Sequence, residues 1–107
     1  MRPTFLLSLV FALSITVAIA QKTNIKEAKK SLGLQPPALS AAKTAIDAAI
    51  VDPTTAGTAE AWYVHGQVYL AIGNDAAMSA GCADCFSQAY SSFLKAEELD
   101  SKKEFVL

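Results

Sequence analysis

Three residues, Trp62, Gly66 and Tyr69, most constrain what this chain can fold into. Steps of four and three residues return to nearly the same side of an α-helix, so the three residues share one helical face. Because glycine has no side chain, a second helix can approach the backbone closely between the two rings. The spacing therefore predicts an architecture of paired helices.

The rest of the chain carries further helical signals and no strand pattern. Asn24 and Glu27 have the spacing of a capping box, Pro37 suits a first helical turn, and Thr58 suits an N-cap. Apolar residues recur at helical spacing and predict helices over residues 24–32, 37–51, 58–73 and 84–99, with a long loop at 74–84. Alanine is abundant in these segments and favours close helix packing. The expected fold class is all-α.

Aromatic side chains on the last two predicted helices are expected in the core. They recur at helical spacing together with alanines. The residues assigned to the core in this way are Trp62, Tyr69, Phe86, Tyr90 and Phe93.

The first twenty residues have the pattern of a signal peptide. Arg2 precedes an uncharged stretch from Phe5 to Ala20, which ends in the small-x-small sequence Ala18-Ile19-Ala20. Cleavage before Gln21 is predicted, leaving residues 21–107 as one domain in the periplasm or outside the cell. An uncleaved anchor is the alternative, although a membrane-spanning helix needs roughly 20 apolar residues and this stretch is shorter.

The charge balance after Ala20 argues against a nucleic-acid-binding protein. All ten acidic residues of the chain lie there, and no arginine does. Arginine usually supplies the bidentate contacts and positive face that such proteins need. The lysines near the predicted N-terminus, Lys22, Lys26, Lys29 and Lys30, are interpreted as a solvated helix face.

The spacing Trp-x-x-x-Gly-x-x-Tyr at 62–69 resembles the first helix of a tetratricopeptide repeat (TPR). The second helix of such a unit resembles residues 89–96, where Ala89, Phe93 and Ala96 keep the spacing Ala-x-x-x-Phe-x-x-Ala. The same spacing is assigned earlier in the chain to Ala41, Ala45 and Ala48. The resemblance implies a short α-solenoid of antiparallel helix hairpins with units at about 22–53 and 58–101, of the type exported by Gram-negative bacteria.

The chain departs from the TPR pattern in three ways. The helix at 24–32 lacks the Trp, Gly and Tyr signature, and His65 stands where the family usually has leucine. The loop before the helix at 84–99 is about eleven residues longer than the family's tight turn. Two units are also fewer than the three or so that normally form a stable array, which leaves self-assembly through an uncovered end as an alternative role.

In TPR proteins the first helix of each unit lines a concave surface that holds extended peptides. The resemblance therefore implies a groove that could hold an acidic or amide-rich segment of an unknown protein partner. The positions carried over to this chain are Glu60, Tyr63, Val64 and Gln67, with Lys26 and Lys30 on the preceding helix. The alternative is a solvated helix face whose contacts lie elsewhere.

Cys82 and Cys85 form the most chemically specific motif, Cys-x-x-Cys at the start of a predicted helix. In an oxidising compartment the expected outcome is a local disulfide that tethers the long loop to that helix. Free thiols, or disulfide exchange through a thiol of lowered pKa, are the alternatives. Zinc needs four ligands and only the distant His65 could join the cysteines, while haem attachment needs histidine where Phe86 stands. No metal or cofactor is expected.

The remaining titratable residues do not form a catalytic pattern in the sequence. His65 is interpreted as a packing histidine, because no Ser, Cys or Asp lies close to it in sequence. Glu97 and Glu98 are neighbours on a helix and project to different sides. We therefore expect an exported protein-binding scaffold and not an enzyme, with a small thiol–disulfide redox protein as the alternative.

Overall fold

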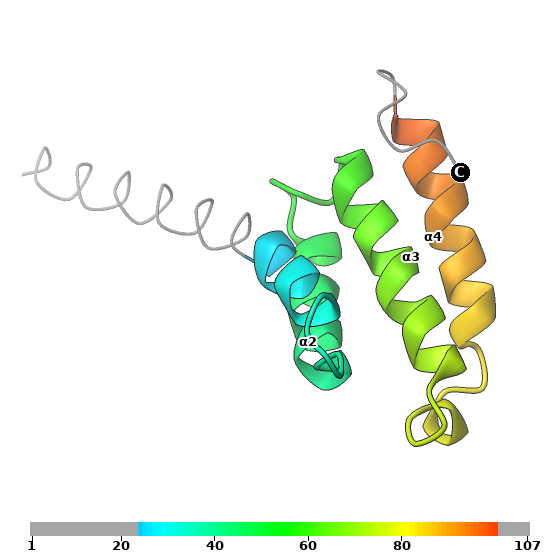
Figure 1. The fold of residues 1–107 in the computed structure, drawn as a ribbon. Helices are drawn as coiled ribbons and strands as arrows, with labels where there is room; N and C mark the ends of the chain where they lie inside the picture. Colours follow the sequence, from blue (N-terminus) through cyan, green and yellow to red (C-terminus); the bar gives the residue numbers. More distant parts are fainter. Residues whose placement is uncertain (1–23, 101–107) are drawn as a thin grey trace, which may run out of the picture.

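The computed structural model describes residues 24–100, which form antiparallel α-helices and contain no β-strand. Helical residues 24–32 come first and are followed by α2 (Leu39–Val51), α3 (Ala59–Asn74), the short 3-10 helix η1 (Ser79–Gly81) and α4 (Cys85–Leu99). Successive α-helices run in opposite directions (Figure 1). The all-α prediction is confirmed. The predicted signal peptide lies outside the described residues, and no helix within them is long and apolar enough to cross a bilayer.

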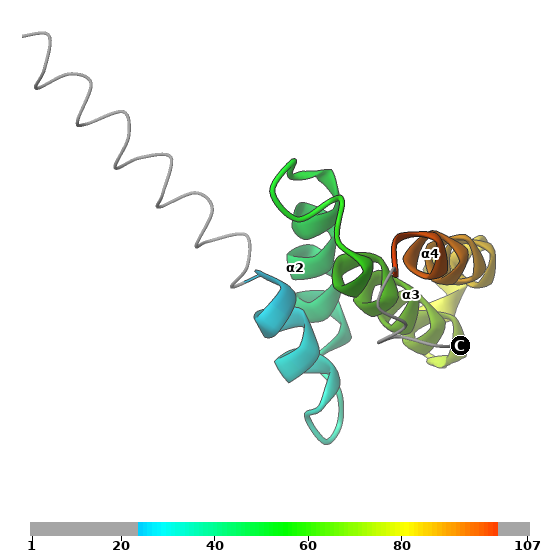
Figure 2. The ribbon, with the colours of Figure 1, turned by 90° about the horizontal axis from the view of Figure 1, so that it is seen from above.

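Helix α3 is the centre of the described fold. It lies between α2 and α4 in two perpendicular views (Figure 1 and Figure 2). Small and branched aliphatic residues fill the space between the helices, and alanine allows the backbones to come close. The most deeply buried of these residues are Ala28, Ala42, Ile46, Ala49, Ala61, Val64, Val68, Ile72 and Ala96.

The loop between α2 and α3 closes both helix ends. The Thr58 hydroxyl accepts a hydrogen bond from the Ala61 N–H at 3.4 Å, so Thr58 caps α3 as predicted. The buried Thr55 hydroxyl donates to the carbonyl of Ala49 at 2.5 Å, near the end of α2. Side chains of one short loop therefore satisfy backbone groups of both helices.

One predicted helix start is wrong. Helix α2 begins at Leu39 and not at Pro37, because the Ala38 N–H donates to the carbonyl of Ser31 at 2.9 Å and holds the chain against the preceding helix. Asn24 is the first described residue and is helical, so the start of the first helix, where the capping box is expected, lies outside the described residues.

The predicted register of α2 is wrong by one residue. Of the three predicted positions Ala45 is buried, but Ala41 is exposed and Ala48 is half-buried, whereas Ala42, Ile46 and Ala49 are fully buried. These three residues have the same spacing, four then three, as the predicted stripe. Alanines occur on several sides of this helix, so small residues alone could not identify the buried side, and the bulky Ile46 decides it.

An aromatic ring from α4 packs against each of the two glycines of α3, Gly66 and Gly73. A Cβ atom on Gly66 would be only 2.6 Å from the ring of Phe93, which belongs to α4. A Cβ atom on Gly73 would be 2.9 Å from the ring of Phe86. The predicted close approach at Gly66 is confirmed, and an aromatic side chain makes it.

The predicted aromatic core is partly wrong. Tyr69 is buried, and Trp62 and Phe93 are half-buried, but Phe86 and Tyr90 are 54% and 67% exposed. Helix α3 covers only one side of α4. The other side carries part of the predicted stripe and has no neighbour among the described residues.

Candidate functional site

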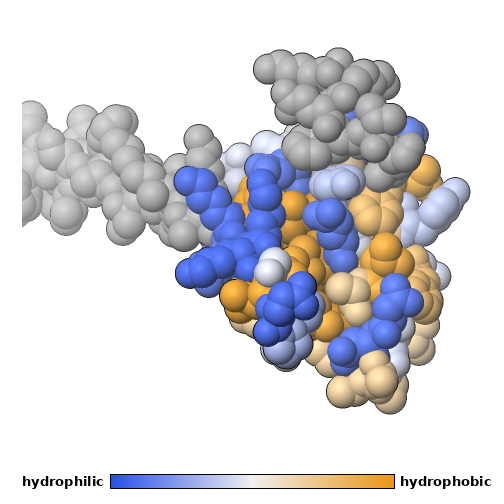
Figure 3. Space-filling model, in the orientation of Figure 1, coloured by the Kyte–Doolittle hydropathy of each residue, from blue (hydrophilic) through white to orange (hydrophobic). Residues whose placement is uncertain are grey.

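The first described helix and the start of α3 are joined by an ion pair. Lys29 Nζ lies 2.8 Å from Glu60 Oε2. Beside this pair is a cavity of about 220 Å³ lined by Ile25, Lys26, Thr54, Thr55, Thr58 and Glu60. Hydrophilic side chains gather over the part of the surface that includes this helix (Figure 3). Lys26 and Glu60, which are distant in sequence, therefore line one hollow.

The predicted groove residues do not all reach the surface. Lys26 and Lys30 are exposed, and Glu60 and Gln67 are half-buried. Tyr63 is half-buried, with its ring centre 5.8 Å from that of Phe93.

Val64 is only 1% exposed and belongs to the core. Helix α3 has neighbours on two sides, so only a narrow strip of it remains open. Val64 faces one of those neighbours and does not line an open groove.

A cluster of polar side chains links α2, α3 and α4. His65 Nδ1 lies 2.6 Å from Ser92 Oγ of α4, and His65 Nε2 lies 3.5 Å from Asp47 Oδ1 of α2. The Tyr69 hydroxyl donates to Asp47 Oδ1 at 2.7 Å, and Lys43 Nζ pairs with Asp47 Oδ2 at 2.8 Å. The imidazole also stacks on the Tyr69 ring, with centres 4.2 Å apart. Asp47 is the shared acceptor of this cluster.

Burial sets the protonation of the cluster. Loss of solvent lowers the pKa of His65 from its usual 6.5, and the nearby Asp47 carboxylate opposes this shift without reversing it. Burial and the hydrogen bond to Asp47 raise the pKa of Tyr69. A neutral imidazole with its Nε2–H toward Asp47 leaves Nδ1 free to accept the Ser92 hydroxyl proton.

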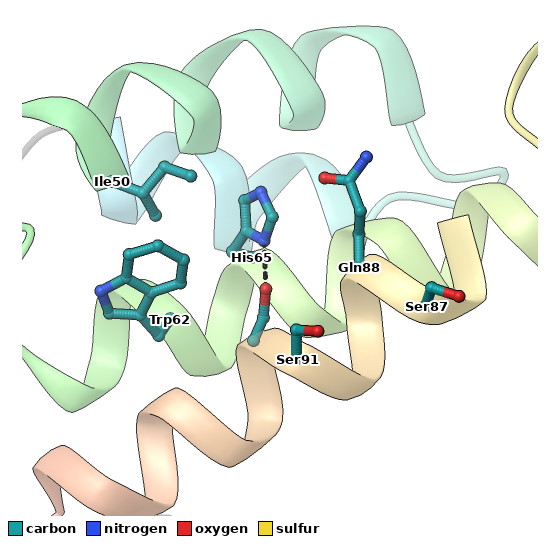
Figure 4. A pocket seen from close by; sticks show the side chains of 7 residues that line it. Ile50, Trp62, His65, Ser87, Gln88 and Ser91 are labelled. Atoms are coloured by element: carbon teal, nitrogen blue, oxygen red, sulfur yellow. Dashed lines mark hydrogen bonds between the residues drawn. The ribbon is translucent and has the colours of Figure 1, made fainter. Parts of the chain in front are cut away.

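Hydroxyl, imidazole and carboxylate thus follow one another in the order used by serine hydrolases. A cavity of about 370 Å³ opens beside them, lined by Ile50, Trp62, His65, Ser87, Gln88, Ser91 and Ser92 (Figure 4). Ser92, however, is 2% exposed and lies inside α4, where helical hydrogen bonds use the backbone N–H groups. Acyl transfer needs an accessible nucleophile and free donors for the oxyanion. The geometry at Ser92 supplies neither, so the cluster acts as a polar link between helices.

Sequence reasoning missed Asp47 and Ser92 as partners of His65. Ser92 is 27 positions away and comes from a different helix. One signal could have found it, because Ser92 interrupts the buried alanine stripe formed by Ala89 and Ala96. A polar residue on such a stripe needs a buried partner.

Cys82 and Cys85 form a disulfide, as predicted, with Cα atoms 5.5 Å apart. Cys85 is buried in the first turn of α4, and Cys82 is half-buried in the preceding loop. Asp84 Oδ1 lies 3.8 Å from Cys82 Sγ.

The described residues contain no group of three or more His, Cys, Asp or Glu side chains arranged to hold a metal ion. No protein-family model matches the chain, and no significantly similar curated protein or solved structure was found.

Proposed function

We propose that this chain is a TPR-like helical scaffold that binds segments of other proteins in the bacterial cell envelope. The binding surface is the hollow between the first described helix, the loop at 54–58 and the start of α3. One observation carries the proposal: the Lys29–Glu60 ion pair brings Lys26 and Glu60 to the same cavity. A hollow between two helices is a common place for a ligand to bind.

The charge of the hollow favours an acidic or amide-rich segment. Lys26 and Lys30 are exposed, whereas Glu60 is already paired with Lys29. Within residues 24–100, these two lysines therefore supply positive charge on this surface that is not already paired with a carboxylate. Three threonines, Thr54, Thr55 and Thr58, also line the cavity, but their hydroxyls already donate to other groups of this chain, so the lysines carry the preference.

The alternative, a thiol–disulfide redox protein, has one favourable feature. The cysteine pair begins an α-helix, whose N-terminus stabilises a thiolate. Thiol titration of the reduced protein separates the two functions, because a redox protein needs a thiol of low pKa and a scaffold does not.

Fluorescence anisotropy with two labelled octapeptides tests the scaffold proposal. One peptide alternates glutamate with glutamine, and the other alternates lysine with glutamine. We expect the acidic peptide alone to bind. Lys26→Glu should weaken its binding about fivefold or more, because a contact of opposite charge becomes one of like charge.

Lys95→Glu provides the matched control, since Lys95 is equally an exposed helical lysine but lies on α4. Its effect should stay within about twofold. Equal weakening by the two variants, or equal binding of the two peptides, would show that net charge alone drives binding and would refute the proposed surface.

A further inference from the structure

The cavity beside His65 lies apart from the hollow proposed for peptides. It has a volume of about 370 Å³ between α3, α4 and the end of α2, and the two sites share no lining residue. Of its lining residues only His65 titrates near neutral pH, and burial lowers the pKa of this imidazole, so it is neutral at pH 7. The cavity therefore presents no charged side chain to a ligand.

The two ends of this cavity differ in chemistry. Trp62 and Ile50 lie at one end, and Gln88 and Ser87 lie at the other, with His65 between them (Figure 4). One end is therefore apolar, and the other carries neutral hydrogen-bonding groups.

The indole ring at the apolar end is already fixed in place. Trp62 Nε1 donates to the carbonyl of Ala56 at 2.6 Å, and the centre of the indole lies 5.7 Å from that of the His65 ring. Because its single N–H group is used, the indole offers a ligand an apolar surface and no hydrogen bond. A ring that is already ordered loses little further freedom when a ligand binds.

Hydroxyl groups at the polar end are available to a ligand. Ser87 and Ser91 are exposed and lie one turn apart on α4, and neither hydroxyl makes a hydrogen bond within residues 24–100. Gln88 Nε2 donates to Asp84 Oδ2 at 3.0 Å, which holds the amide and leaves its oxygen free to accept. A serine hydroxyl can both donate and accept. The polar end therefore suits a ligand whose own groups do both.

The lining selects among classes of ligand. A charged ligand would lose water without gaining a counter-charge, because no charged side chain lines the cavity. A wholly apolar ligand would cover the hydroxyls and leave them without partners. An asparagine or glutamine side chain would satisfy the hydroxyls but has little apolar surface to place on the indole. The cavity therefore favours a neutral ligand with an apolar face and hydroxyl groups beside it.

We propose that this cavity is a second binding site and that it takes a neutral sugar unit. A pyranose ring has a face of C–H groups, and its hydroxyls project from the ring edge as both donors and acceptors. The C–H face packs on the Trp62 indole, and the hydroxyls bond to Ser87 and Ser91. This site is independent of the peptide hollow, so either can be absent without the other.

Tryptophan fluorescence tests the proposal directly, because Trp62 is the only tryptophan of the chain. The full chain, as the producing cell processes it, is titrated with glucose, galactose, mannose and N-acetylglucosamine. We expect at least one of them to give a saturable change with a dissociation constant in the millimolar range, because the ligand is small and the serines are exposed. Glycerol, which has hydroxyls but no ring, should give no saturable change.

Ser91→Ala removes one hydroxyl and keeps the fluorescent indole. It should raise the dissociation constant about three- to tenfold, as expected for one lost neutral hydrogen bond, and Ser87→Ala/Ser91→Ala should raise it further. Ser40→Ala is the matched control, because Ser40 is also an exposed helical serine but lies on α2 and does not line this cavity. Its dissociation constant should equal that of the unmodified chain. Circular dichroism checks that every variant keeps its helical content.

Oligosaccharides of the sugar that binds separate two sources of the ligand. Tighter binding than the monosaccharide identifies a unit within a glycan, and equal or weaker binding identifies the free sugar; both support the site. The proposal would be overturned if no sugar gave a saturable change, or if the double alanine variant bound as well as the unmodified chain. Tighter binding of a glycine–glutamine tetrapeptide than of any sugar would also overturn it, because a peptide would then occupy the cavity.

Discussion

The two sides of α3 pack by different physical means. Toward α4, a ring lies on a glycine, and the contact at Gly66 is so close that no side chain would fit there. Toward α2, the Tyr69 hydroxyl and the His65 imidazole meet the Asp47 carboxylate above a layer of alanines. The close contact at Gly66 therefore distinguishes the α3–α4 pair, which also contains the His65–Ser92 hydrogen bond, and the contacts to the Asp47 carboxylate distinguish the α2–α3 pair. Different substitutions should therefore destabilise the two interfaces.

The largest effect is expected from filling the space at Gly66. Gly66→Leu should lower the free energy of unfolding by about 3 kcal/mol, because the new side chain displaces the Phe93 ring. Thermal unfolding followed by circular dichroism should show a fall in Tm of roughly 10–20 °C for a domain of this size. Gly73→Leu is the control. Its neighbour Phe86 is half exposed and can move aside, so a loss of about 1 kcal/mol or less is expected. Equal losses at the two glycines would contradict steric control by Phe93.

Removing the disulfide should weaken the α4 end of the fold by a smaller amount. The bond closes a very short loop, so its loss should cost about 2 kcal/mol of unfolding free energy in the chain-entropy description. Urea unfolding of oxidised and reduced protein measures this difference. A midpoint unaffected by reduction would mean that the loop at 75–84 holds its place without the bond.

The α2–α3 interface can be tested without changing its volume. Tyr69→Phe removes the hydroxyl that donates to Asp47 and should cost about 1–2 kcal/mol, since the acceptor is charged. Tyr90→Phe is the matched control. Tyr90 is exposed, and its hydroxyl has no described hydrogen bond, so its stability should change by less than about 0.5 kcal/mol. Equal effects of the two substitutions would show that the hydrogen bond from Tyr69 to Asp47 does not stabilise this interface.

The same interface should respond to pH through His65. Its folded-state pKa lies below the usual 6.5, so the unfolded chain binds the proton more readily. The contribution of neutral His65 to the free energy of unfolding is therefore fully present above pH 6.5 and is lost progressively as the pH falls below 6.5. The slope cannot exceed about 1.4 kcal/mol per pH unit for one group. Urea titrations at pH 7, 6 and 5 should show this loss, and His65→Gln should remove most of it. An unchanged slope in the variant would assign the pH dependence to other groups.

Local patterns in the sequence predicted the helices well. Thr58 and the glycine spacing at 62–69 identified α3 to within one residue of its observed bounds. These signals act through backbone geometry and near neighbours, so a single segment is enough to read them. The start of α2 escaped prediction because the hydrogen bond from Ala38 to Ser31 joins separate elements.

The candidate sites were less predictable. Lys26 and Glu60 were both identified in the sequence, but their meeting at one cavity depends on how the first helix lies against α3. Val64 was assigned to a groove and is buried, because both neighbours of α3 determine which strip stays open. The function carried over from the TPR resemblance stays a proposal.

What the sequence by itself determined is the helical class of the chain, the cap at Thr58 and the need for a bare backbone at Gly66. Each follows from the conformational preferences of a short segment. Tertiary structure alone decided which stripe of α2 is buried, which groups surround His65, and that Tyr90 lies in solvent. Those outcomes depend on side chains that the fold brings together from distant positions in the sequence. Whether one face of a helix is buried depends on which other helix packs against it.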